Sequence, residues 1–157
     1  MAEDDLLLDQ AIDVYLSGLK GLEAFISEPS ARFALSFEQY LILRSITKQP
    51  GIKLMDIAAQ RQVTRSAVSR QLKVLLSNGY VVQKRDPADR RRQSLVVTPQ
   101  GTTVERQITA RVRERFKKWV AVYGSERGQM LLDLLADFNK QILQSDQDVN
   151  KEQGKND

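Results

Sequence analysis

The sequence predicts a mainly α-helical protein that carries one small β-hairpin. Apolar residues recur at steps of three and four along most of the chain, which is the helical repeat. The 157 residues include only 8 glycines and 4 prolines, so long helices are favoured over many short strands. Two short valine-rich stretches flank a polar loop, which indicates the hairpin. A chain of this length hides roughly two-thirds of its unfolded surface and can build a proper core.

The first expected helix covers residues 4–27, and Pro29-Ser30 is expected to end it. A second helix is expected after Ser36, which serves as its N-cap, and Gln49-Pro50-Gly51 should stop it. The apolar seam of the first helix consists of Leu8, Ile12, Tyr15, Leu19, Leu22 and Ile26, and the stripe of the second of Tyr40, Leu41, Leu43 and Ile46.

Residues 54–78 are typical of two helices joined by a tight turn. A short helix is expected over 54–60, and Thr64 should cap a second helix that runs to Asn78-Gly79. Gly79 suits the left-handed conformation that follows many helices. The side chains expected to pack together in this pair are Leu54, Ile57, Ala58, Val63, Val68, Leu72 and Leu75.

The hairpin is expected to pair residues 80–85 with residues 93–98. Thr98 should then cap a long helix with Pro99 in its first turn, and Gly124-Ser125 should separate that helix from a last one. Helix, turn, helix and hairpin in this order predict a winged helix-turn-helix. The stripe of the long helix is Val104, Ile108, Val112, Phe116, Trp119 and Tyr123, and that of the last helix is Leu131, Leu134, Leu135, Phe138, Ile142 and Leu143.

Four parts are therefore expected along the chain: an N-terminal dimerisation helix at 1–35, the winged unit at 36–101, C-terminal dimerisation helices at 102–147 and a polar tail at 148–157. The two flanking parts are assigned to dimerisation because their apolar faces lie outside the winged unit, whose own core is already supplied.

Positive charge is concentrated in the middle of the chain. Residues 53–92 carry ten basic and three acidic side chains, a balance of +7, while residues 1–52 balance at −4 and residues 93–157 at +1. Hydroxyls, Arg and Lys on one helix face suit a major groove, and a thin arginine-rich loop suits a minor groove. A solvated helix face and a solubilising turn are the alternative interpretation. The DNA-binding candidates are Thr64, Arg65, Ser66, Ser69, Arg70, Lys73, Asp89, Arg90, Arg91 and Arg92.

Composition excludes several classes of function. The chain has no cysteine and no histidine, so disulfide scaffolds, zinc fingers and His-based catalysis are excluded. No glycine-rich phosphate loop or nucleophile-base pair is apparent, and we expect neither an enzyme nor a bound cofactor or metal. The acidic start lacks the features of a secretory signal, and no apolar run approaches the roughly 18 residues of a membrane span. We therefore expect a soluble, cytoplasmic protein.

Several stretches together resemble the MarR family of bacterial transcriptional regulators. They are Val63–Leu72, Leu75–Val81, the Asp-Pro-x-Asp-Arg-Arg loop that starts at Asp86, and the Leu-x-x-Thr-x-x-Gly exit that ends at Gly101. The residues match over about 54–101, and the flanks match in layout only. The resemblance implies an obligate homodimer with intertwined terminal helices. We therefore expect a dimeric repressor, and the two-fold axis that relates its recognition helices requires an inverted-repeat operator.

The resemblance also implies site residues. The recognition helices of the dimer would enter successive major grooves, and the wings would enter the flanking minor grooves. The wing Asp-x-Arg motif falls on Asp89 and Arg91. The recognition-helix contacts fall on Thr64, Arg65, Ser66, Ser69 and Arg70.

The missing cysteines and histidines exclude the oxidant- and zinc-sensing modes of this family, so the expected effector is a small organic or lipid-like molecule, or a protein that carries one. Plain core or interface packing is the alternative role for the aromatic residues that are candidates for its cavity. Arg111, Arg113, Arg115, Lys117 and Lys118 could hold an anionic ligand or form a solvated face. The aromatic candidates are Tyr15, Phe25, Phe33, Phe37, Tyr40, Trp119 and Tyr123.

Two other functions remain open on the sequence. A winged-helix module could serve protein contacts without DNA readout, although the +7 balance over 53–92 disfavours it. The helix over 104–123 could lie on a membrane surface, although its stripe is needed to cover the core.

Overall fold

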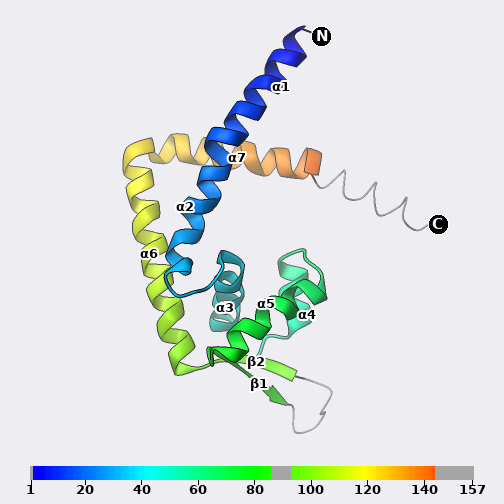
Figure 1. Ribbon diagram of the computed structural model, residues 1–157, viewed down its shortest axis with the longest axis vertical. Helices are drawn as coiled ribbons and strands as arrows, with labels where there is room; N and C mark the ends of the chain where they lie inside the picture. The colour runs from blue at the N-terminus through cyan, green and yellow to red at the C-terminus, as the bar shows by residue number, and fades with distance from the viewer. Residues whose placement is uncertain (1, 86–92, 144–157) are drawn as a thin grey trace, which may run out of the picture. The chain divides into compact units, whose positions relative to one another are not determined.

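The computed structural model describes residues 2–85 and 93–143. It confirms the predicted class, a mainly helical fold with one antiparallel hairpin. The chain divides into two compact units, Met1–Val112 and Arg113–Asp157. In chain order the elements are α1 (Ala2–Val14), the π-helical turn η1 (Tyr15–Leu19), α2 (Lys20–Ala31), α3 (Phe37–Lys48), α4 (Leu54–Gln60), α5 (Arg65–Ser77), β1 (Val81–Arg85), β2 (Gln93–Val97), α6 (Pro99–Tyr123), α7 (Ser125–Phe138) and the π-helical turn η2 (Asn139–Leu143) (Figure 1).

The core of the first unit is centred on α3, which contacts α2, α5 and β2. Because α3 is covered on several sides, Ile42 is buried together with the predicted Tyr40, Leu43 and Ile46, and the predicted Leu41 is only half-buried. The core side chains that join these include Ile57, Val68, Leu72, Leu75, Val81, Leu95, Val104 and Ile108.

Local caps explain where α3 begins and ends. The Ser36 hydroxyl accepts a hydrogen bond from the Gln39 amide at 3.1 Å, and the Gln39 side chain accepts one from the Ser36 amide at 2.9 Å. This reciprocal capping box satisfies two amides that the helix itself leaves without partners. The helix ends at Gln49, and Gly51 follows with φ +88°. The predicted cap and stop are confirmed.

The prediction that Pro29-Ser30 ends the first helix is wrong. The helical segment continues to Ala31 with Pro29 inside α2, and it contains the π-helical turn η1. A proline in the last turn removes only one N–H donor. The neighbouring Ser30 is fully buried, and its carbonyl accepts hydrogen bonds from the amides of Phe33 and Leu35 at 2.9 and 3.2 Å. Tertiary burial therefore stabilises this turn in spite of the proline.

The predicted packing of the helix pair holds except at Val63. Ile57, Ala58, Val68, Leu72 and Leu75 are buried and Leu54 packs against them, but Val63 is 38% exposed. It lies in the turn between α4 and α5.

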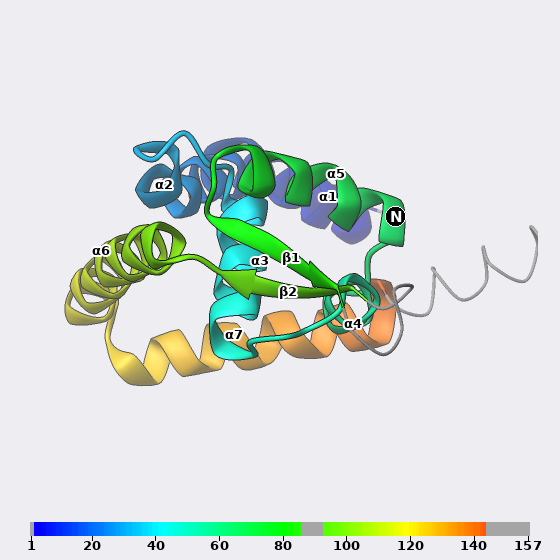
Figure 2. The same ribbon diagram turned by 90° about the horizontal axis from the view of Figure 1, so that it is seen from below.

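The hairpin pairs Val81 with Val97 and Arg85 with Gln93 (Figure 2). Each strand is one residue shorter than predicted, because Tyr80 and Thr98 serve the junction with α6. The Thr98 amide donates to the Tyr80 carbonyl at 3.0 Å, and the Thr98 hydroxyl donates to the Gly79 carbonyl at 2.7 Å. The same hydroxyl accepts from the Gly101 amide at 3.0 Å, which is the predicted cap of α6. A Cβ at Gly101 would collide with the Tyr80 carbonyl oxygen, so this position requires glycine.

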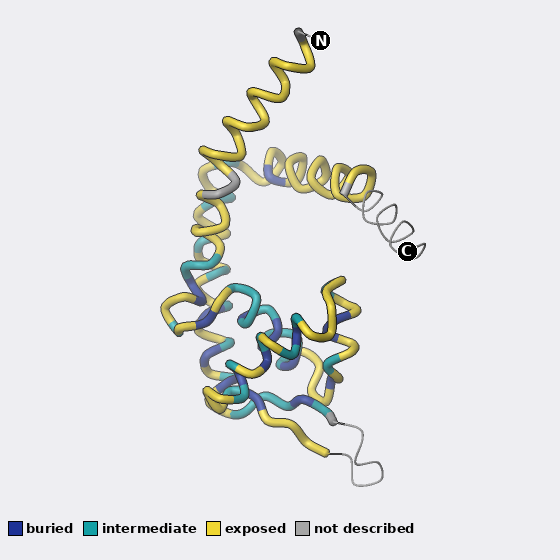
Figure 3. Tube along the Cα trace, turned by 45° about the vertical axis from the view of Figure 1, so that its right-hand side comes forward, coloured by how far each residue is buried: buried dark blue, intermediate teal, exposed yellow. Residues whose placement is uncertain are grey.

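Large apolar side chains of the terminal helices are exposed, and the tube in Figure 3 shows α1 and α7 almost entirely in the colour of exposed residues. Within the second unit Trp119 stacks on Tyr123, with ring centroids 5.8 Å apart, and Arg127 lies over the Tyr123 ring. None of the helices in the described part of the chain has the length and apolarity to cross a membrane. The exposed apolar residues of the terminal helices include Leu8, Ile12, Tyr15, Leu22, Ile26, Leu131, Leu134, Leu135 and Phe138.

Candidate nucleic-acid interface

Helix α5 separates its apolar and basic residues onto two faces. Val68, Leu72 and Leu75 are buried in the core, which orients the helix. The opposite face carries Arg, Lys and hydroxyl side chains and no carboxylate. Five of the six predicted recognition-helix residues are exposed and Ser69 is half-buried; the exposed ones are Thr64, Arg65, Ser66, Arg70 and Lys73.

The N-terminus of α5 is suited to an anion. Thr64 caps it by accepting a hydrogen bond from the Ala67 amide at 3.2 Å, and the Thr64 and Ser66 hydroxyls lie 3.1 Å apart. The amides of a helix's first turn have no intrahelical acceptor and carry its positive dipole end. With Arg65 beside them and no acid in the first turn, this end favours a phosphate.

Two side-chain bridges from the first turn of α3 brace the helix pair. Gln39 donates from its amide nitrogen to the Gln71 side chain of α5 at 3.0 Å. Arg61, at the C-cap of α4, donates from Nε and from a terminal nitrogen to Glu38 Oε1, at 3.0 and 2.7 Å. The Arg61 charge is therefore neutralised inside the fold, and the balance of +7 over 53–92 overstates the exposed charge by one. Sequence reasoning missed both bridges, because their partners lie 23 and 32 positions apart.

The tip of the wing, with the candidates Asp89, Arg90, Arg91 and Arg92, lies outside the described residues. On the described part of the hairpin, Lys84 and Arg85 are exposed at the end of β1 that leads into this tip. Neither residue was a sequence-based candidate. Two consecutive basic residues beside an arginine-rich loop were the available signal, and they extend the positive charge of the wing along its strand.

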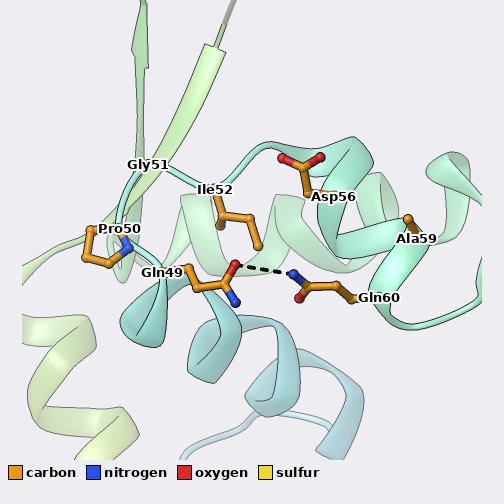
Figure 4. Close-up of a pocket in the computed structure, with 7 residues that line it drawn as sticks. All are labelled: Gln49, Pro50, Gly51, Ile52, Asp56, Ala59 and Gln60. Atoms are coloured by element: carbon orange, nitrogen blue, oxygen red, sulfur yellow. Dashed lines mark hydrogen bonds between the residues drawn. The ribbon is translucent and has the colours of Figure 1, made fainter.

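A hollow of about 490 Å³ lies between the end of α3 and α4 (Figure 4). The figure shows the Gln49 and Gln60 side chains meeting in it, and Gln60 donates to Gln49 at 3.2 Å. Asp56 takes part in capping α4, since its carboxylate accepts from the Lys53 amide at 3.4 Å. The contact between Gln60 and Gln49 braces α4 against α3. Among the described residues, no group of three or more Asp or Glu side chains is placed to hold a metal ion.

The aromatic candidates for an effector cavity have different surroundings. Tyr40 is a core residue whose hydroxyl lies 2.9 Å from that of Thr109, and Phe33 packs against the same core. Tyr15 and Phe25 are exposed on the N-terminal helix, and Trp119 belongs to the second unit. A pocket of about 720 Å³ in the first unit lies instead between α2 and α3, and of the aromatic candidates only Phe37 lines it.

The fold and this surface together define a winged helix-turn-helix protein: a braced helix pair, an exposed basic face on its second helix, and a hairpin that carries further basic residues. Comparison with known proteins refines that class. The sequence model of the MarR family matches residues 35–92. The HTH-type transcriptional regulator FarR of Neisseria gonorrhoeae is 30% identical over 103 residues, which cover 66% of this chain and 70% of that protein.

A second relative is the HTH-type transcriptional regulator SAV2265 of Staphylococcus aureus. It is 25% identical to this chain over 119 residues, which cover 76% of this chain and 79% of that protein. Two solved structures share the fold. MarR of S. aureus in complex with salicylate and kanamycin gives a TM-score of 0.71 at 19% identity, over 91% of this chain and 97% of that one. The MarR family regulator SP03579 gives a TM-score of 0.69 at 21% identity, over 90% of this chain and 98% of that one.

The chain belongs to the MarR family and is a transcriptional regulator, not an enzyme. Regulators of this family bind DNA and act as dimers.

Proposed function

We propose that this regulator is a homodimeric repressor that binds an inverted-repeat operator and releases it in response to an effector. The observation that carries the proposal is the exposed, acid-free face of α5, which the buried Val68, Leu72 and Leu75 turn outward. A helix of this kind presents its N-terminal residues to base edges in the major groove.

The side chains divide by the contacts that they can make. Arg65 and Arg70 have the forked guanidinium that recognises guanine, while Ser66, Ser69 and Lys73 suit phosphates. Thr64 combines capping with a phosphate contact. In the wing, Asp89 would hold the loop's shape, and Arg90, Arg91 and Arg92 would enter the minor groove, where negative potential is concentrated.

The exposed apolar faces of the terminal helices support the proposal of a dimer. Leu8 is 58% exposed on α1 and Leu134 is 68% exposed on α7, with further apolar residues around each. Apolar faces of this extent rarely stay in water on a monomer, so a second copy is the proposed cover. The two-fold axis of that dimer would relate two α5 helices and require a symmetric operator.

Effector control is supported by the 720 Å³ pocket between α2 and α3. MarR of S. aureus, which shares the fold, was solved with salicylate and kanamycin bound. For this chain we propose a small organic effector, since cysteine- and histidine-based sensing is excluded by composition.

Selection of bound DNA from a random pool, with the full chain, tests the DNA-binding part. We expect an enriched inverted repeat with half-site centres about 10 base pairs apart, or a multiple of this spacing. Affinity for it should fall steeply with salt, because several phosphate contacts release counterions. Enrichment of no sequence by a folded dimer would contradict the proposal and favour a protein-interaction module.

A further inference from the structure

The pocket between α2 and α3 combines an apolar wall with negative charge. Leu22 and Ile26 line it from α2, and Leu35 and Phe37 line it from the start of α3 and the segment before it. Glu23 and Glu38 add two carboxylates. None of the described residues that line it is basic. An apolar pocket whose lining holds two carboxylates and no basic residue favours a positively charged guest over an anion, although Glu38 already pairs with Arg61 outside the pocket.

Glu38 has a second role outside the pocket. Its Oε1 accepts both hydrogen bonds from Arg61, and the Arg61 side chain is only 18% exposed. Arg61 caps the C-terminus of α4, three positions before Thr64, the N-cap of α5. One carboxylate thus belongs both to the wall of the pocket and to the brace that holds the turn between the two helices.

We propose that this pocket binds a small organic cation with an apolar body, and that the cation competes with Arg61 for Glu38. The inference rests on the proposed effector response and names the chemistry and route of that response. A cation beside Glu38 stabilises the carboxylate, and it also repels the guanidinium of Arg61, so the brace weakens. Because the brace ends at Arg61, three positions before the N-cap of α5, its loss loosens the turn that positions α5 and lowers DNA affinity. Bound DNA weakens binding of the cation by the same factor in return.

Two ions of nearly the same shape and opposite charge test the class of guest. Tetraphenylphosphonium and tetraphenylborate are titrated separately into the full chain by calorimetry. We expect the phosphonium ion to bind, and the borate ion to bind at least about tenfold more weakly. Because the two ions have nearly the same shape, such a difference in affinity reports the sign of their charge. Equal affinity for the two ions, or tighter binding of the borate, overturns the proposal.

Variants then locate the site and test the competition. Glu23→Gln and Glu38→Gln should each weaken phosphonium binding by about three- to tenfold, as expected for an ion pair at a partly exposed site. Glu28→Gln is the matched control, because Glu28 lies on α2, pairs with Arg32 and does not line the pocket. Melting curves show which variants remain folded.

Arg61→Gln separates competition from simple structural damage. Without the guanidinium, the cation no longer competes with Arg61 for the Glu38 carboxylate. Phosphonium binding should therefore tighten by about two- to fivefold, while DNA affinity falls. A merely structural role would weaken both. Unchanged or weaker phosphonium binding by a folded Arg61→Gln protein overturns the competition, as does full-strength binding by both pocket carboxylate variants.

Operator release is measured apart from binding. If phosphonium binding follows charge and variants as expected but leaves operator affinity unchanged, the proposed effector response fails while the assignment of the pocket stands. If another compound releases the operator and the phosphonium ion does not bind, the effector response stands and the cation pocket fails.

Discussion

The winged unit and the terminal helices use the same kinds of residue with opposite results. Ile42 and Leu75 are fully buried in the winged unit, whereas Leu7 on α1 and Leu134 on α7 are 64% and 68% exposed. Burial of a leucine side chain contributes about 1.5–3 kcal/mol, so the winged unit obtains this stabilisation within one chain and the terminal helices do not. The difference shows that the winged unit has a complete core within one chain, and it is the basis for the proposal that a second copy covers the terminal helices.

The largest expected effect is in the complete core. Leu75→Ala removes a fully buried side chain and should lower the free energy of unfolding by about 2–5 kcal/mol. Chemical denaturation measures it at several protein concentrations. If the winged unit is closed within one chain, the loss should be the same at each concentration. Val82→Ala, at a 41% exposed position, is the control and should change stability far less.

The terminal helices should behave in the opposite way. Phe138→Asp places a charge on an apolar face of α7 that is exposed in the single chain. We expect the dimer to weaken by about 2 kcal/mol or more, with dissociation visible in sedimentation, while the melting of the winged unit hardly changes. Gln129→Asp tests an exposed polar position on the same helix and should leave the dimer intact. A wild-type protein that sediments as a monomer would remove the basis of the comparison.

A third test concerns the exposed face of the winged unit. Arg70→Ala should cost about 1–3 kcal/mol of operator binding and relax the preference at one base pair, if Arg70 reads a base edge. Binding to an operator and to its single-base variants, measured by fluorescence anisotropy, gives both quantities. Arg32→Ala is the control, because Arg32 lies in the turn just after α2 and pairs with Glu28. An equal loss at every base-pair variant would assign Arg70 to a phosphate instead.

The smallest expected effect is in the wing. Arg91→Ala should weaken binding to all sites by a similar amount, because the minor groove offers only a coarse distinction between A·T and G·C pairs. The slope of log affinity against log salt should fall by about one unit for one lost phosphate contact. Thermal stability should stay within about 0.5 kcal/mol, as for most surface substitutions. Full-strength binding with an unchanged slope would mean that the wing does not touch DNA.

Sequence reasoning predicted the elements of the winged unit closely. The helix over 54–60 matches α4, and Ser36, Thr64 and Thr98 are the caps that were expected. Gly79 and Gly124 have positive φ at the helix ends where the sequence placed breaks. These features were predictable because each depends on a few neighbouring residues, whose backbone angles and hydrogen bonds are set locally.

The candidate interface was predictable only in part. Its residues on α5 followed from the helical repeat, once the buried stripe was assigned. The exposed Lys84 and Arg85 were not predicted, because they belong to the strand and not to the arginine-rich loop that carried the signal. The brace from Glu38 to Arg61 and the bridge from Gln39 to Gln71 join residues that only the packed fold brings together.

The sequence alone thus determined the order of elements, their ends, the basic face of α5 and the absence of thiol and imidazole chemistry, because composition, periodicity and caps are local properties. The tertiary structure decided the rest. It carried the helix past Pro29, buried Ile42, left Val63 exposed and neutralised Arg61. Each outcome depends on which other element covers a side chain, and burial and pairing between distant positions are properties of the packed chain.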